Sequence, residues 1–180
     1  VRAVRELMLS LFPCETGQTP RLLTFIEQND PLRMDPDDYR LDTEFTGLDQ
    51  LERLRIWAKL DARVVDHPYV QPALSEEQEP DDTLVLSVLG SNGVGLEACA
   101  LEAHLRRFFG ISVRKGEPLD TDATAAMQLA ALRAACSAGA EIALIDPMPL
   151  AGAVSTPDAA RALVGDSRPE LTFLEALKRV

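Results

Sequence analysis

The sequence predicts an α/β protein in which a helical N-terminal part precedes an open parallel sheet of β-α-β-α-β order. Three features predict this class. Residues 1–70 carry apolar side chains at helical spacing, and residues 71–82 form an acidic stretch with two prolines. From residue 83 onward, short Leu- and Val-rich runs alternate with capped helical segments. We therefore expect a helical cap subdomain at 1–70, a linker at 71–82 and an α/β ligand-binding domain at 83–180.

Three helices are expected in the N-terminal part. The first covers the opening dozen residues, and the second begins at Thr19-Pro20, with the threonine as N-cap and the proline in the first turn. The third runs from about Leu48 to Val64, because leucines recur there at helical spacing. Residues 30–45 are rich in aspartate and glutamate, so we expect a solvated acidic loop there, with a partner-binding surface as the alternative.

Three strands and two crossover helices are expected in the second part, followed by two shorter helices. In chain order they are strand 83–89, helix 96–109, strand 111–114, helix 120–139 and strand 141–146. The first strand is a continuous apolar run, which is typical of parallel strands buried on both faces. The β-α-β-α-β order implies right-handed crossovers between neighbouring parallel strands.

The charge of the chain excludes several classes of partner. With 18 lysines and arginines against 29 aspartates and glutamates, the net charge is −11, which repels nucleic-acid phosphates and anionic membranes. The chain has no apolar run of membrane-spanning length, and its first residues do not lead into a signal-peptide core. We therefore expect a cytoplasmic protein that binds neither nucleic acid nor membranes.

The three cysteines, Cys14, Cys99 and Cys136, are odd in number, and no two of them have the spacing of a metal motif. Free thiols in a reducing cytoplasm are the expected state. A redox role for Cys99 and Cys136 is the alternative.

The turn after strand 83–89 is the main candidate for a ligand site. In open α/β sheets, ligands bind at the carboxyl ends of strands beside helix N-termini, and glycines there let a ligand approach the backbone. The alternative is a tight turn in which the glycines only supply positive φ angles. The residues expected to contact a ligand are Gly90, Ser91, Asn92, Gly93 and Gly95.

Two nucleotide-binding motifs can be compared with this turn. Gly90 and Gly95 have the separation of the P-loop glycines, but Leu96 and Glu97 stand where the P-loop has Lys and Ser or Thr. The order Gly-x-x-Gly-x-Gly also differs from the dinucleotide fingerprint Gly-x-Gly-x-x-Gly. One alternative remains, a degenerate nucleotide-binding domain that acts as a structural or assembly subunit.

The strand and turn Leu86–Gly95 resemble those of cobalamin-binding domains, whose turn reads Gly-Ser-Asp-Gly-His-Asp-x-Gly. Here Asn92 takes the place of the first aspartate, and Val94 takes the place of the histidine that ligates cobalt, so cobalt ligation through this turn is excluded. The sequence looks more like the variant of the family that holds heme instead of cobalamin, found in purple-bacterial regulators of photosynthesis genes. The resemblance covers residues 83–146, and such domains carry a helical cap before the sheet.

The resemblance implies a regulatory sensor that binds heme, or cobalamin, and antagonises a transcriptional repressor by protein contact. His104 would be the axial ligand of the heme iron, since its helical neighbours are apolar and Arg106 and Arg107 could meet the propionates. The alternative is a histidine on the flank of an amphipathic helix. The second histidine, His67, is expected to cap a helix end or lie at the surface. No catalytic constellation is evident, so an enzyme is not expected.

Overall fold

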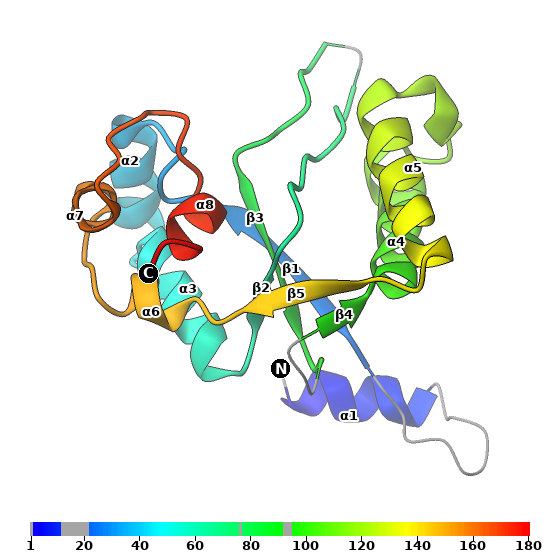
Figure 1. The fold of residues 1–180 in the computed structure, drawn as a ribbon, viewed down its shortest axis with the longest axis horizontal. Coiled ribbons are helices and arrows are strands. Elements are labelled where there is room, and N and C mark those ends of the chain that lie inside the picture. Colours follow the sequence, from blue (N-terminus) through cyan, green and yellow to red (C-terminus); the bar gives the residue numbers. More distant parts are fainter. Residues whose placement is uncertain (1, 12–21, 76, 92–94) are drawn as a thin grey trace.

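The computed structural model describes residues 2–11, 22–75, 77–91 and 95–180. A five-stranded sheet lies between two groups of helices, with α2, α3, α6, α7 and α8 on one side and α4 and α5 on the other (Figure 1). The strands are β1 (Thr24–Asn29), β2 (Arg63–Val65), β3 (Leu84–Leu89), β4 (Gly95–Glu97) and β5 (Glu141–Ile145). Their order in the sheet is β1-β3-β2-β5-β4, and every neighbouring pair is antiparallel.

The predicted open parallel sheet of β-α-β-α-β order is therefore wrong. Strands β3 and β5 do point the same way, as the prediction required, but β2 lies between them and pairs antiparallel with both. Strand β1 likewise pairs antiparallel with β3 along its whole length. The order of elements within 83–146 suggested that β3 and β5 are neighbours in a parallel sheet. Two strands from the first 70 residues change this arrangement, since β2 lies between β3 and β5 and β1 lies on the other side of β3.

The expected strand at 111–114 is also wrong. Residues Phe109–Val113 form a π-helical turn that continues α4 (Ala98–Phe108). Phe109 and Val113 are buried in the core while Ile111 is 70% exposed, so the apolar run has one buried face at helical spacing. The helices expected on either side of it are confirmed as α4 and α5 (Ala123–Ser137), and strands β3 and β5 are confirmed as well.

The N-terminal part differs from the expected all-helical cap. Helix α1 (Arg2–Leu11) is confirmed, but the segment expected to form the second helix contains β1. The expected acidic loop contains helix α2 (Pro36–Thr46), which Asp35 caps by accepting a hydrogen bond from Asp37 N–H. The third helix is shorter than expected, since α3 (Gln50–Lys59) ends before a turn at Asp61 and the chain continues as β2.

Two hydrophobic clusters hold the layers together, one on each face of the sheet. Adjacent strand residues point to opposite faces: Val64 and Val85 join the cluster under α3, α6 and α8, and Val65 and Leu86 join the cluster under α4 and α5. The short helices α6 (Met148–Ala151), α7 (Pro157–Val164) and α8 (Phe173–Leu177) close the first cluster. Strands from both predicted parts thus share one sheet and one pair of cores.

The predicted linker belongs to a long excursion between β2 and β3, which rises between the two helical groups in Figure 1. An antiparallel bridge between Gln71 and Asp81 closes the excursion. The start of β2 pairs with the second half of β3, through Arg63 with Val88 and Val64 with Ser87. Below the bridge at Gln71 and Asp81, the two chain segments diverge.

Candidate ligand-binding cleft

A cleft of about 390 Å³ lies where the segments after β2 and before β3 diverge. Its volume falls within the range of small-molecule sites in proteins. Valines and leucines of β2 and β3 form an apolar floor, which consists of Val64, Val65, Leu84, Val85 and Leu86. Helix α8 and the residues that follow β2 provide the walls. No single chain segment makes this cleft, so local sequence patterns do not reveal it.

Ion pairs connect its charged lining residues. Lys178, just after α8, contacts the carboxylate of Asp66, which follows β2. Arg33, in the loop after β1, donates to both carboxylate oxygens of Asp82 at 3.0 and 3.1 Å. Each pair joins the helical layer to a chain segment at the end of a strand. Both cations therefore already have a carboxylate partner within the cleft.

Helix α8 is held against the cleft by the buried carboxylate of Asp30. One oxygen accepts a hydrogen bond from Leu32 N–H at 2.8 Å, and the other accepts one from Phe173 N–H, in the first turn of α8, at 2.7 Å. Burial raises the pKa of Asp30 to about 6, against the opposing effect of these two N–H groups and of Arg33 and Arg161.

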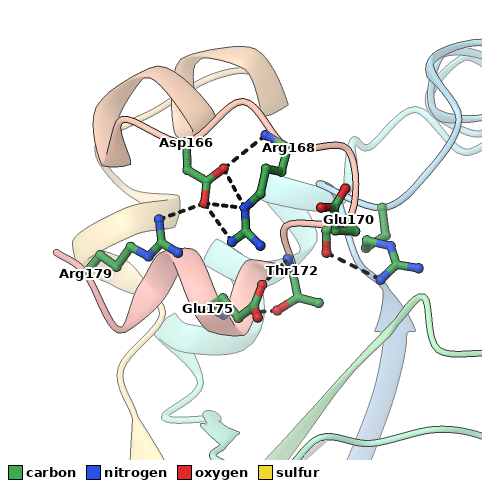
Figure 2. A network of polar contacts seen from close by, with 7 residues as sticks. Asp166, Arg168, Glu170, Thr172, Glu175 and Arg179 are labelled. Carbon is green, nitrogen blue, oxygen red and sulfur yellow. Dashed lines mark hydrogen bonds and ion pairs between the residues drawn. The ribbon is translucent and has the colours of Figure 1, made fainter.

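A second polar network fixes the chain around α8, and Figure 2 shows it from close by. Asp166 accepts hydrogen bonds from Arg168 and from Arg179 at 2.8 Å, which ties the segment before α8 to the segment after it. These arginines, Arg168 above all, lower the pKa of Asp166. Thr172 and Glu175 form a reciprocal capping box at the start of α8. The wall that α8 provides is thus anchored at both ends.

His67 lines the cleft and has an unusual side-chain environment. Its Nε2 atom is shielded from solvent and has no hydrogen-bond partner among the described residues. Burial lowers the pKa of His67, with the neighbouring Asp66 acting in the opposite direction, so the imidazole is neutral at neutral pH. Buried polar atoms are nearly always paired, so an unpaired nitrogen on a residue that lines a cleft makes His67 the candidate polar contact of a ligand.

The sequence prediction for His67 was a capping or surface residue at a helix end. The helix in fact ends at Lys59, and His67 follows strand β2. The signal that could have found it is its place directly after the apolar pair Val64-Val65, because residues that follow buried strands often line sites.

Tyr69 connects this cleft to a carboxylate outside its lining. The phenol is 5% exposed, lines the cleft and donates its hydroxyl hydrogen bond to Glu27 on β1. Burial, with a smaller effect of the nearby Asp81, raises the pKa of Glu27 to about 7. The hydroxyl is therefore already paired with a carboxylate that does not line the cleft, so Tyr69 offers a ligand mainly its apolar ring.

The predicted Gly-rich site lies elsewhere. The turn joins β3 to β4 and does not lead directly into a helix N-terminus, because β4 precedes α4. Gly90 has a φ of +89°, which requires a glycine there. A Cβ on Gly95 would stand 2.7 Å from Glu141 Oε2, the end of an exposed side chain that can move aside. Neither Gly90 nor Ser91 nor Gly95 lines the cleft. Asn92 and Gly93 lie outside the described residues, and ligand binding at this turn stays a prediction.

His104, the predicted heme ligand, packs within an aromatic cluster. Its ring lies face to face with Phe25, with ring centroids 3.8 Å apart and planes inclined by 13°, and it runs parallel to Phe108. Burial lowers the pKa of His104 to about 4. His104 does not line the cleft, and Phe25 occupies the space over one face of the imidazole. An axial ligand would bind iron through a ring nitrogen in the plane of the imidazole, and stacking on the ring face leaves that direction open. The role of His104 as a heme ligand, and heme binding itself, therefore stay predictions.

Cys99 and Cys136 form a disulfide that joins the start of α4 to the end of α5. The expectation of free thiols is wrong for these two, while Cys14 lies outside the described residues. Within the described part of the chain, no group of three or more His, Cys, Asp or Glu side chains could hold a metal ion. Nor does any described helix have the length and apolar character needed to cross a membrane.

The fold and the cleft define an α/β protein with an antiparallel sheet between two helical layers and a ligand-sized cleft at one end of it. No protein-family model matches the chain, and neither curated proteins nor solved structures match it. The resemblance to cobalamin-binding domains therefore stays an untested hypothesis.

Proposed function

We propose that the chain is a ligand-binding module and that the cleft beside His67 is its site. The observation that carries the proposal is that His67 lines a cavity of about 390 Å³ and that its buried Nε2 has no hydrogen-bond partner among the residues that the structure describes. A buried polar atom without a partner lowers stability by about 1–3 kcal/mol, and a ligand that supplies the partner recovers this free energy. The function is binding and not catalysis.

The ligand that fits best is a small, neutral, largely apolar molecule with one hydrogen-bonding group. Valines and leucines of β2 and β3 are among the lining residues, and they favour an apolar body. The cations Arg33 and Lys178 are already paired with carboxylates, so a charged ligand would have to break an ion pair. A neutral ligand leaves both pairs in place and needs only His67 as its polar contact.

The cleft also offers a route for a regulatory signal. A bound ligand would touch Leu174 of α8 on one side and the segment after β2 on the other, and so would hold two layers in one arrangement. This supports the regulatory-sensor hypothesis, with a protein partner as the receiver. A cytoplasmic location stays part of the proposal, although the disulfide between Cys99 and Cys136 is more typical of an oxidising compartment. The cleft itself offers no support for the tetrapyrrole, because His104 does not line it.

The test is a fragment screen followed by NMR of the two imidazoles. Only two histidines exist, so the ring signals of His67 and His104 can be assigned without ambiguity. We expect neutral fragments that bind to shift the His67 signals and to leave those of His104 unchanged. His67→Leu should weaken the same fragments about tenfold, the loss of one hydrogen bond, whereas His67→Gln should retain part of the affinity.

The outcome that contradicts the proposal is equally clear. If fragments bind the wild-type chain but His67→Leu binds them with the same affinity, the cleft is not the site. Leu163→Gln, at an exposed apolar position on α7, serves as the matched control and should bind as the wild type does.

A further inference from the structure

Helix α2 and the residues just after it carry an exposed apolar patch. Leu41 is 60% exposed, Phe45 is 90% exposed and Leu48, just beyond the helix, is 36% exposed. The spacing of four residues places Leu41 and Phe45 on one side of the helix, and Leu48 follows the left-handed cap at Gly47. No residue of α2 is buried, so this side of the helix contributes little to the core. A phenylalanine exposed to this degree, beside an exposed leucine on the same side of the helix, indicates an interaction surface.

Acidic residues border this patch on both sides. Asp38 stands three residues before Leu41 and Glu44 stands three residues after it, so helical geometry puts them on opposite sides of the leucine. Asp37 lies on the same side as Glu44. Arg40 forms ion pairs with Asp37 at 3.7 Å and with Glu44 at 3.0 Å, which leaves three carboxylates against one guanidinium around the patch.

We propose that this face of α2 docks an amphipathic, basic helix of a partner protein. Such a helix would present apolar side chains at positions i, i+4 and i+7 to Leu41, Phe45 and Leu48, and lysines or arginines to the flanking carboxylates. The charge border argues against two other occupants. A second copy of this chain would bring the same acids together, and an anionic membrane would be repelled by them.

The surface is independent of the cleft and of its ligand. Leu41 and Phe45 do not line the cleft, and Asp35 and Gly47 cap α2 without residues of β2, β3 or α8. Substitutions at exposed positions of α2 should therefore leave the fold intact. Arg53 of α3 contacts Asp42 at 2.9 Å on another side of α2, which holds the helix in place when the patch is changed.

The experiment uses a fluorescein-labelled synthetic peptide of about 18 residues, with leucines at positions i, i+4 and i+7 and lysines beside them. Fluorescence anisotropy with the full chain should show saturable binding that weakens as salt is added. Phe45→Ser and Leu41→Ser should each reduce the affinity at least about tenfold. Glu44→Lys should reduce both the affinity and its salt dependence. Met127→Ser, at a position on α5 that is 67% exposed, is the matched control and should bind as the wild type does.

Circular dichroism and urea unfolding of each variant separate lost binding from lost structure. Four results would overturn the proposal. They are equal affinity in Phe45→Ser, equal binding of a peptide in which glutamates replace the lysines, and a reversible dimer that Phe45→Ser abolishes in sedimentation. The fourth is co-sedimentation of the chain with vesicles of phosphatidylserine and phosphatidylcholine.

Discussion

The side-chain amide of Gln128 pairs with the backbone of Val70 in both directions. Its Nε2 donates to the carbonyl oxygen of Val70 at 2.7 Å, and Val70 N–H donates to its Oε1 at 3.1 Å. Gln128 lies on α5 and is 6% exposed, whereas Val70 belongs to the segment that follows β2 and lines the cleft. The amide thus takes the place of a neighbouring strand and ties one wall of the cleft to α5.

Replacing this amide should loosen that wall. Gln128→Leu retains the volume of the side chain but leaves the N–H and C=O of Val70 without these partners, so we expect the free energy of unfolding to fall by about 1–3 kcal/mol. Urea denaturation measures it. Met127→Gln, on the exposed side of the same helix, should change it by less than about 0.5 kcal/mol. A Gln128→Leu variant as stable as the wild type would show that water replaces the amide fully.

Asp30 should make the stability of the fold depend on pH between about 4 and 6. Its pKa in the folded chain is raised to about 6 from 3.8, so the folded state holds a proton that the unfolded state has lost in this range. The contribution of Asp30 is therefore fully present at the acidic end and is lost as the pH rises through 6. The size of the effect is about 3 kcal/mol, from about two pKa units.

The measurement is urea denaturation of the wild type and of Asp30→Asn at a series of pH values. Asparagine does not ionise, so the stability deficit of the variant should be largest near pH 4 and should shrink toward pH 6. The variant also loses one acceptor for the N–H groups of Leu32 and Phe173, which gives a deficit that does not depend on pH. A constant difference at all pH values would show that Asp30 is ionised throughout.

Local patterns predicted the elements of this fold better than their pairing. Helix α5 was predicted from an expected cap at Asp120-Thr121, whereas the N-cap in the structure is Asp122. Strand β5 was predicted because it is an apolar run between a glycine and an aspartate. The short strand β2 could not be separated from the end of α3, since Val64-Val65 also fits helical spacing. Its position between β3 and β5 depends on long-range contacts, and this insertion is what overturns the parallel sheet.

The candidate site could not be predicted either, because it too depends on contacts between residues that are distant in the sequence. Asp30, His67 and Lys178 are far apart in the sequence, and the antiparallel pairing of the strands brings them to one cleft. A motif search finds residues that are close along the chain, such as Gly90 and Gly95, and so it favoured the turn.

His104 should titrate well below an ordinary histidine because Phe25 shields it from water. Its pKa is lowered to about 4, so the unfolded chain takes up a proton first and this residue reduces stability as the pH falls from 6.5 toward 4. We expect NMR titration of the imidazole to place the midpoint near 4 and Phe25→Ala to raise it toward 6.5, because the ring becomes hydrated. A midpoint near 6.5 in the wild type would contradict the packing of this cluster.

The same residue tests the heme hypothesis. Heme added to the wild type and to His104→Ala should give the same absorbance spectrum if His104 is only a packing residue of the aromatic cluster. A Soret band that requires His104 would instead show that the imidazole binds iron.

The disulfide between Cys99 and Cys136 should contribute substantially to stability. It spans a sequence separation of 37 residues, and closing a loop of this length in the unfolded chain stabilises the folded state by about 4 kcal/mol in the chain-entropy account. We expect a dithiol reductant to lower the midpoint of urea unfolding of the wild type. Cys99→Ser/Cys136→Ser should have the lower midpoint without reductant and should not respond to it. Alkylation of the thiols in freshly lysed cells then tests the proposed cytoplasmic location, because a reducing cytosol keeps such cysteines as thiols. A wild type whose midpoint is unchanged by full reduction would show that the packing of α4 against α5 suffices without the bond.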